Sequence, residues 1–288
     1  MQSKEIPSIP EIEQEPSSRI NLSFLRHGEK EPGKGDVSIT EKGKQQAKEA
    51  GLRFRKEPDV ARTVGFGSPR IRTQETAAWL MSAGRDDITG NESVEELKAK
   101  LDEGLMIGKK IGIEPKLDAI VTGGEGQAAL REGRYLRFLI EDRPKNFSRN
   151  AARIAEIVKK YYQVAPRWDR IVQKETDEDK RTLERILVTH QGLSEAFLAK
   201  LIEKTKGEDE RKRFVEALDN QGFNETEGFQ VEIDNIPGKE PQIRIRYKRE
   251  ENGKIRFEFD ENVPPKMINQ IIEEGEKFYL EVEGDETK

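Results

Sequence analysis

The sequence contains no cysteine, which excludes disulfide bonds, thiolate nucleophiles and cysteine-ligated zinc. It contains only two histidines, without the close spacing typical of a metal site, so the set of available metal ligands is thin. No stretch approaches the roughly 18 consecutive apolar residues of a membrane-spanning helix. The first residues are acidic and proline-rich, unlike the basic and then apolar start of a secretory signal. We therefore expect a cytoplasmic protein with no membrane partner, no metal and no cofactor.

Neither sign of charge dominates the chain. The 51 basic residues nearly balance the 56 acidic ones, and the formal net charge of -5 gives no general attraction to nucleic acid or to an anionic membrane. Because no basic stripe or aromatic platform is present either, we set nucleic-acid binding aside. Hydrophobic residues make up only 33% of the sequence, so the core has to come from a few apolar runs. The length of 288 residues accommodates one large domain with an insertion, or two domains.

The first two-thirds of the chain alternate between strand and helix patterns. Residues 1–18 are rich in proline and glutamate and are expected to form a disordered tail, so the domain should span 19–288. Thr40 is placed to cap the first helix, and Ser148 is placed to cap a later one. The periodicity predicts strands at 20–25, 63–68 and 185–189, and helices at 43–54, 72–81, 149–162 and 194–204.

Two segments depart from this alternation. Residues 84–147 have a mixed pattern, with helical pieces at 93–101 and 128–140 around a glycine-rich stretch at 122–126, and we expect an insertion that covers the functional site. Residues 222–288 form a C-terminal extension in which apolar and polar residues alternate, as in half-buried strands, before a final helix at 264–279. The dipeptide Asn252-Gly253 in this extension predicts a type I′ hairpin turn.

Strands that alternate with helices imply a largely parallel sheet covered by helices on both faces. The fold class expected from the sequence is therefore a three-layer α/β/α domain. Its central sheet should be mostly parallel, with a helical insertion over the site and antiparallel strands added near the C-terminus.

Both histidines stand where an apolar strand ends and a glycine turn begins. His27 follows the first predicted strand, and His190 follows the strand at 185–189. Ligands bind at the carboxyl ends of strands in open α/β sheets, so neighbouring strands would bring the two imidazoles into one crevice. Arg26 and Arg72 stand at the same strand ends, and a guanidinium grips phosphate oxygens with a rigid fork of donors. Two arginines and two histidines around one point favour a phosphate pocket over a metal site.

Four motifs in order resemble the histidine phosphatase superfamily, also called phosphoglycerate mutase-like. They span residues 20 to 200. The segments at 39–47 and 188–192 are similar to the Leu-Thr-x-x-Gly-x-x-Gln-Ala and late His-Gly motifs of the family. The other two are Arg26-His27-Gly28, which resembles the Arg-His-Gly signature, and Ser68-Pro69-Arg70-Ile71-Arg72, which resembles Ser-Pro-Leu-x-Arg with arginine in place of leucine.

The resemblance implies a role for each matching residue. His27 would be the nucleophile and become phosphorylated, while Arg26, Arg72 and His190 would hold the phosphoryl oxygens. A neutral imidazole is available as a nucleophile at pH 7, which agrees with this role. Glu29 also occupies a motif position.

The general acid is harder to assign. Family members often carry a Leu-x-Glu segment after the second motif, whereas this chain has Leu117-Asp118-Ala119. Asp118 is therefore the first candidate for the acid, followed by Glu125 and then Glu103.

These features predict a metal-independent phosphatase that hydrolyses phosphate monoesters through a phosphohistidine. Two alternatives stay open. A phosphoglycerate-mutase reaction is disfavoured because this chain continues Lys30-Glu31-Pro32-Gly33 where mutases have Ser-x-Trp-Asn. A non-catalytic phospholigand-binding module is suggested by the alanine at 119. The substrate partner is a phosphorylated small molecule or a phosphoprotein, with sugar phosphates, nucleotides and phytate-like compounds all open, and the oligomeric state is also open.

Overall fold

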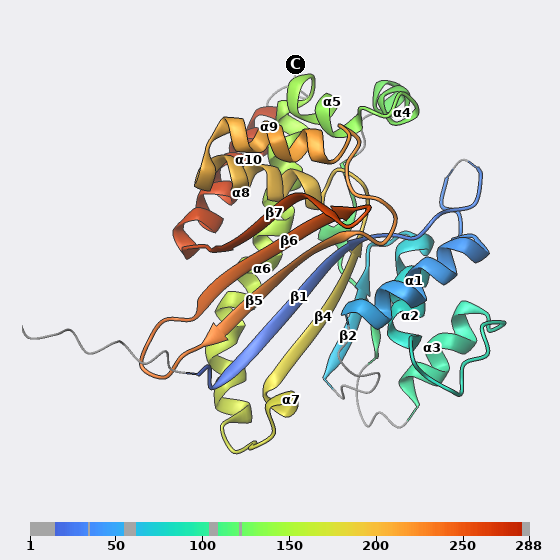
Figure 1. Ribbon diagram of the computed structural model, residues 1–288, viewed down its shortest axis with the longest axis vertical. Coiled ribbons are helices and arrows are strands. Elements are labelled where there is room, and N and C mark those ends of the chain that lie inside the picture. The colour runs from blue at the N-terminus through green and yellow to red at the C-terminus, as the bar shows by residue number, and fades with distance from the viewer. Residues whose placement is uncertain (1–14, 34, 55–61, 104–108, 121–122, 284–288) are drawn as a thin grey trace, which may run out of the picture.

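A seven-stranded sheet forms the centre of the computed structural model, which describes residues 15–33, 35–54, 62–103, 109–120 and 123–283 (Figure 1). The strands lie in the order β3-β2-β4-β1-β5-β6-β7. Their bounds are Ser18–Arg26 for β1, Thr63–Gly67 for β2, Ile111–Ile113 for β3, Thr182–Thr189 for β4, Gly228–Asn235 for β5, Gln242–Glu251 for β6 and Lys254–Asn262 for β7.

The sheet is parallel in its first half and antiparallel in its second. Strands β1, β2, β3 and β4 pair in parallel, whereas β5, β6 and β7 add antiparallel pairings beyond β1. Asn252 and Gly253 connect β6 to β7 with φ angles of 51° and 71°, the conformation of a type I′ turn. The expected hairpin and the expected mixture of parallel and antiparallel strands are thus confirmed.

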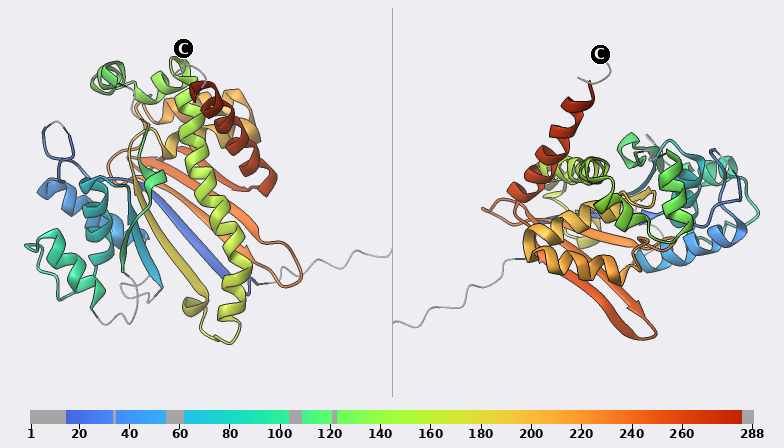
Figure 2. Two further views of the ribbon diagram at one scale, coloured as in Figure 1. Left: turned by 180° about the vertical axis from the view of Figure 1, so that it is seen from behind. Right: turned by 90° about the horizontal axis from the view of Figure 1, so that it is seen from above.

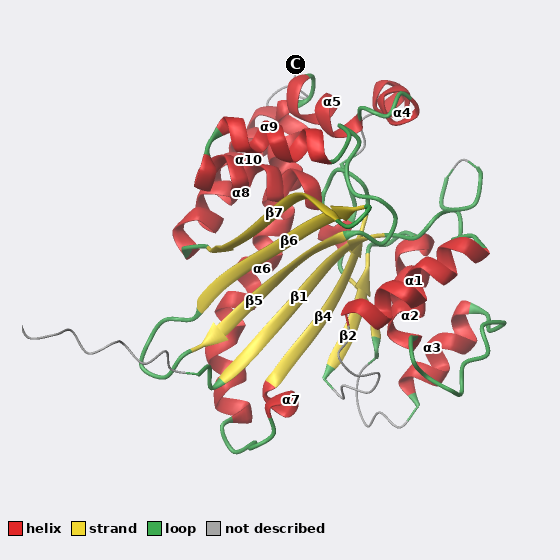
Figure 3. Cartoon of the chain, viewed as in Figure 1, coloured by secondary structure: helices red, strands yellow, loops and turns green. Residues whose placement is uncertain are grey.

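Helices cover both faces of the sheet. Helix α6 crosses behind the strands in Figure 1 and in front of them in the reversed view of Figure 2, whereas α1 and α2 lie on the opposite face. Figure 3 shows the three resulting layers by secondary structure. The helix bounds are Glu41–Phe54 for α1, Ile71–Ser82 for α2, Val94–Asp102 for α3, Gly123–Arg131 for α4, Tyr135–Glu141 for α5, Pro144–Val172 for α6, Glu178–Arg181 for α7, Ser194–Lys206 for α8, Glu208–Ala217 for α9 and Pro265–Glu283 for α10, with a 3-10 turn at Pro115–Leu117.

Two hydrophobic cores lie on the two faces. Phe24 and Leu25 are neighbours in β1 and point to opposite sides, as successive strand residues do. Phe24 stacks on Phe229 at a ring distance of 5.0 Å within the larger core, to which α6, α8 and α10 contribute. Leu25 packs with Trp79 of α2 in the smaller core. Burial on both faces explains why β1 and β4 read as nearly continuous apolar runs.

Some element boundaries differ from those predicted. The helix expected at 149–162 from a Ser148 cap begins instead at Pro144 and runs to Val172. Proline is favoured in the first turn of a helix because its missing N–H has no partner there in any case. The glycine-rich stretch at 122–126 contains the start of α4 at Gly123, and the helix expected at 128–140 is broken at Gly133, which has a φ of +70°.

The structure describes only part of the predicted N-terminal tail. Residues 1–14 of the expected tail lie outside the described residues. Strand β1 begins at Ser18, and the hydroxyls of Ser17 and Ser18 both donate to Asp169 of α6, so order begins before Arg19. The division of the chain into a tail, a 19–288 domain and its insertions stays a prediction.

The described residues of the predicted insertion at 84–147 lie in two parts of the molecule. Its first half supplies α3, whose Leu97 and Leu101 pack in the smaller core, and the edge strand β3. Only its second half, from Asp118 to Tyr135, lines the cavity described below. None of the described helices combines the length and apolar character that crossing a membrane requires.

Candidate active site

Strand register brings the two histidines together. Arg26 of β1 is paired with Thr189 of β4, so the residues that follow them, His27 and His190, leave adjacent strands at the same level. The backbone N–H of His27 donates to the Thr189 carbonyl at 3.0 Å. The imidazole ring centroids are 5.4 Å apart. On the other side of β4, Gly67 pairs with Val188, which places Ser68 beside His190.

A cavity of about 870 Å³ opens at these strand ends. It contains the four side chains expected to meet there, two imidazoles and two guanidinium groups. Most other lining residues come from the loop after β1, from the 118–135 segment and from the turn before β5, while Arg70 follows β2 and Gln191 follows β4. The charged and aromatic members of the lining are Arg26, His27, Glu29, Lys30, Glu31, Arg70, Arg72, Asp118, Tyr135, His190 and Glu225.

The tautomer of His27 is fixed by its neighbours. Nδ1 lies 2.7 Å from the carbonyl oxygen of Gly28, and because a carbonyl only accepts, Nδ1 must carry the proton. The Nε2 lone pair therefore faces the cavity, where it accepts a hydrogen bond from Nε of Arg72 at 3.3 Å. Only 7% of His27 is exposed. This burial, with the neighbouring His190 and the cationic arginines, holds the pKa of His27 well below 6.5, so its imidazole is neutral at pH 7.

His190 has the opposite tautomer. Its Nδ1 lies 3.2 Å from Nη2 of Arg72, which can only donate, so the proton of the neutral ring is on Nε2. Nε2 faces Oγ of Ser68 at 2.8 Å and Oδ1 of Asp118 at 3.2 Å. Burial lowers the pKa of His190, although the hydrogen bond to Asp118 opposes that shift. Arg72 thus binds one nitrogen of each imidazole and holds the pair in a fixed arrangement.

Arg26 is held by the turn between α9 and β5. Its Nη1 donates to the carbonyl of Phe223 at 2.6 Å, and its Nη2 pairs with Glu225 at 2.9 Å. The Arg26 backbone pairs with the same turn through Thr226 and Glu227. The C-terminal extension therefore fixes one of the guanidinium groups of the cavity, a contribution that sequence periodicity did not indicate.

Asp118 is the predicted carboxylate that reaches the centre of the site. Besides His190, its side chain contacts Nε of Arg70 at 3.4 Å. Its loop is anchored from both sides, because the Leu117 carbonyl accepts from the Thr189 hydroxyl at 2.9 Å and the Asp118 carbonyl accepts from Arg153 of α6. The position matches the first candidate chosen from the sequence, while its role as a catalytic acid stays a prediction.

The other predicted carboxylates lie farther from the two imidazoles. Glu29 lines the outer cavity, where it pairs with Lys42 at 2.6 Å and accepts from the Thr40 hydroxyl at 3.2 Å. Thr40 also caps α1, with its Oγ 2.9 Å from the N–H of Gly43, as expected. Glu125 forms an ion pair with Arg143 and does not line the cavity, and Glu103 is an exposed residue at the end of α3. Neither is placed to exchange a proton with a group between the imidazoles.

Sequence reasoning missed Glu195, which organises the site from within the core. This side chain is fully buried in the first turn of α8. Its two oxygens accept from the N–H groups of Gly192 and Phe223, each at 2.9 Å. It thereby joins the turn after His190 to the turn that holds Arg26, and its burial raises its pKa to about 7. A glutamate in the first turn of a helix is usually a surface residue, so no sequence pattern indicates that Glu195 is buried.

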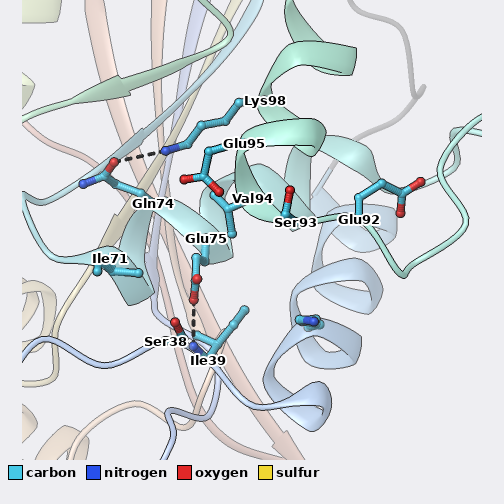
Figure 4. Close-up of a pocket in the computed structure, with 11 residues that line it drawn as sticks. Ser38, Ile39, Ile71, Gln74, Glu75, Glu92, Ser93, Val94, Glu95 and Lys98 are labelled. Carbon is cyan, nitrogen blue, oxygen red and sulfur yellow. Dashed lines mark hydrogen bonds between the residues drawn. The ribbon is translucent and has the colours of Figure 1, made fainter.

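A second cavity, of about 530 Å³, lies between α2, α3 and the segment before α1 (Figure 4). Its lining has no histidine and no arginine. Lys98 donates to Gln74 at 3.3 Å, and Glu75 accepts from the N–H of Ile39 at 2.7 Å. These contacts join α3 and the segment before α1 to α2, and no lining residue that the structure describes matches the phosphate chemistry of the first cavity. Across the described part of the chain, no three histidine or carboxylate side chains converge as metal ligands would.

Comparison with known proteins gives a family match over part of the chain. Residues 22–116 match the family model described as histidine phosphatase superfamily (branch 1). No curated protein matches the sequence. Solved structures with similar folds include a mycobacterial hydrolase (17% identity, TM-score 0.44, 79% of this chain and 96% of that chain) and a mycobacterial glucosyl-3-phosphoglycerate phosphatase (18%, 0.43, 75% and 91%). A phosphoserine phosphatase from Entamoeba histolytica is also similar (17%, 0.39, 78% and 94%). At these identities and TM-scores the structural likeness assigns no function.

Proposed function

We propose that this chain is a phosphatase that hydrolyses phosphate monoesters through a phosphohistidine on His27, and the match of residues 22–116 to the histidine phosphatase superfamily model supports this. The observation that supports this most strongly is the tautomer of His27. Its proton is engaged by the Gly28 carbonyl, so the Nε2 lone pair points to where Arg72 donates. The nucleophilic Nε2 of His27 is thus buried, held in one orientation and hydrogen-bonded to the cationic Arg72.

The phosphoryl group enters between the two imidazoles. Arg72 and Arg26 then bind its equatorial oxygens, and the hydrogen bonds that Arg72 makes to the imidazoles pass to the phosphoryl oxygens. His190 binds an oxygen as well once its Nδ1 takes up a proton, because the proton of the neutral ring is on Nε2. Preorganised cationic donors of this kind stabilise the charge that develops in an in-line transfer. Phe223 already holds the Arg26 guanidinium, and Ser68 and Asp118 already hold the His190 ring, so little reorganisation of these two groups is needed during the reaction.

The reaction proceeds in two steps. First, the Nε2 lone pair of His27 forms the N–P bond while the bond from phosphorus to the leaving group breaks. Second, a water oxygen forms a P–O bond, the N–P bond breaks, and its electron pair returns to Nε2. The water loses a proton in this second step, and Asp118 is the carboxylate placed to accept it. No metal takes part in either step.

The test is a phosphatase screen of the full chain against phosphorylated metabolites and phosphopeptides, with His27→Ala as the control. We expect phosphate release by the wild-type chain and a loss of at least about 10³-fold in the variant, as when a nucleophile is removed. Undiminished turnover by His27→Ala would contradict the proposal. Binding of vanadate without turnover of any substrate would favour a phospholigand-binding module, and interconversion of phosphoglycerates in a coupled assay would favour a mutase.

A further inference from the structure

The carboxylate of Asp118 is surrounded by donors. Nε2 of the neutral His190 ring carries the proton, because Arg72 occupies the other ring nitrogen, and it lies 3.2 Å from Oδ1 of Asp118 and 2.8 Å from Oγ of Ser68. Arg70 presents its Nε–H at 3.4 Å from Oδ2 and 3.5 Å from Oδ1. A protonated carboxyl group would have to turn its own O–H away from these donors, so both neighbours favour the ionised form.

The charge state of Asp118 follows from these contacts. The hydrogen bond from His190 is the main cause that holds the pKa of Asp118 below its usual value; partial burial opposes it, and the Arg70 guanidinium adds a smaller lowering contribution. The loop cannot easily carry the carboxylate away, because the N–H of Ile120 also donates to the side-chain oxygen of Asn150 at 3.2 Å in α6. The site therefore holds an anion, not an acid, beside the reacting group at neutral pH.

An ionised carboxylate can accept a proton but has none to give. It can serve the second step, in which water must lose a proton. It cannot protonate a departing alkoxide in the first step, and it repels the negative charge that develops on such a leaving group. A phosphate whose leaving group is a weak base, such as a phenol, a carboxylate or an imidazole, departs without this assistance.

We propose that the site acts on phosphates with weakly basic leaving groups, that Asp118 works only as the base toward water, and that Arg70 enforces this selectivity. The proposal rests on the proposed function. In the first step the leaving group takes the electron pair of its bond to phosphorus and departs without a proton from the enzyme. In the second step the proton of the attacking water goes to Asp118 and then to solvent.

Arg70 is the specificity-determining residue because its positive charge opposes the effect of a bound phosphate on the protonation of Asp118. The negative charge of the phosphoryl group favours protonation of Asp118, and the adjacent guanidinium opposes that change. Leucine usually occupies the position of Arg70 in the motif that this chain resembles, so Arg70→Leu removes the charge and keeps an apolar stem. Arg137→Leu is the matched control, since Arg137 pairs with Glu141 on an exposed face of α5 outside the cavity.

The first measurement is kcat/KM for a series of phosphates from 4-nitrophenyl through phenyl to ethyl phosphate. General acid catalysis contributes about 10²- to 10⁴-fold, so without it the wild-type chain and Arg137→Leu should favour the 4-nitrophenyl ester over the ethyl ester by more than about 10³-fold. Arg70→Leu should reduce that preference by at least about tenfold. Equal turnover of aryl and alkyl phosphates by the wild-type chain would overturn the proposal and leave the proposed function standing. An unchanged preference in Arg70→Leu would overturn the role of Arg70.

The second measurement is a rapid-mixing experiment with Asp118→Asn and 4-nitrophenyl phosphate. If Asp118 acts only in the second step, the variant should release about one equivalent of nitrophenol per enzyme in a burst and then turn over slowly. Loss of the burst in a variant with unchanged circular dichroism would show that Asp118 is needed in the first step and would contradict the proposal. Failure of the wild-type chain to turn over any ester, or to form a phosphoenzyme, would instead count against the proposed function.

Discussion

The buried carboxyl of Glu195 makes the stability of the protein depend on pH in a direction that can be calculated. Its pKa is raised to about 7 in the folded chain, chiefly by burial, against a reference value of 4.5. Because the folded state then binds this proton more tightly than the unfolded state, the contribution of Glu195 to stability is fully present at low pH and is lost as the pH rises from 4.5 through 7. Each unit of pKa difference corresponds to about 1.4 kcal/mol, so Glu195 accounts for a loss of roughly 3 kcal/mol over that range.

Glu195→Gln isolates this effect, because glutamine has nearly the same shape and does not titrate. Urea unfolding of both chains between pH 5 and pH 8 gives the difference in free energy of unfolding at each pH. All other titrating groups are shared, so the wild-type chain should lose about 2 to 3 kcal/mol relative to the variant across this interval. A difference that stays constant with pH would refute the raised pKa of Glu195 and the reasoning from its burial.

Three further outcomes follow from the packing and from the two imidazoles. Gly43→Ala should destabilise the chain by about 1 to 3 kcal/mol in thermal unfolding, because a Cβ there overlaps the carbonyl oxygen of Glu29. Gly124→Ala in α4, where a Cβ meets nothing within 4 Å, should leave stability unchanged or raise it by roughly 0.5 to 1 kcal/mol; equal losses in both variants would contradict the packing argument. Long-range ¹H–¹⁵N NMR spectra at pH 7 should show two neutral rings, His27 protonated at Nδ1 and His190 at Nε2, whereas an imidazolium signal from His27 would contradict the depressed pKa.

The sequence predicted the centre of the site because that centre is built from local motifs at strand ends. His27 and His190 each follow an apolar run, and a parallel sheet brings such ends together wherever the two strands are neighbours. Asp118 was found from its place after the second motif. The prediction for the two histidines needed only short segments and one general property of α/β sheets, whereas the prediction for Asp118 also used the resemblance to a family motif.

The features that the sequence did not predict depend on contacts between distant segments. From the sequence alone Glu195 resembles a solvent-exposed helix residue, and only the fold brings the backbone N–H of Phe223 to its carboxylate. The pairing of Arg70 with Asp118 requires a loop whose path no periodicity describes. The predicted starts of α6 and α4 were also wrong, because Pro144 begins one helix and Gly123 lies within the first turn of the other. Tertiary packing decides such positions, and local propensity does not.

The central claim is that His27 carries the phosphoryl group, and the most direct test is to trap it. The wild-type chain is mixed with a ³²P-labelled aryl phosphate, quenched, and analysed for protein-bound label. We expect label that is stable in alkali and labile in acid, as a phosphoramidate bond on an imidazole is, and that maps to the peptide containing His27. A chain that hydrolyses the substrate with no such label, or with equal label after His27→Ala, would contradict the account.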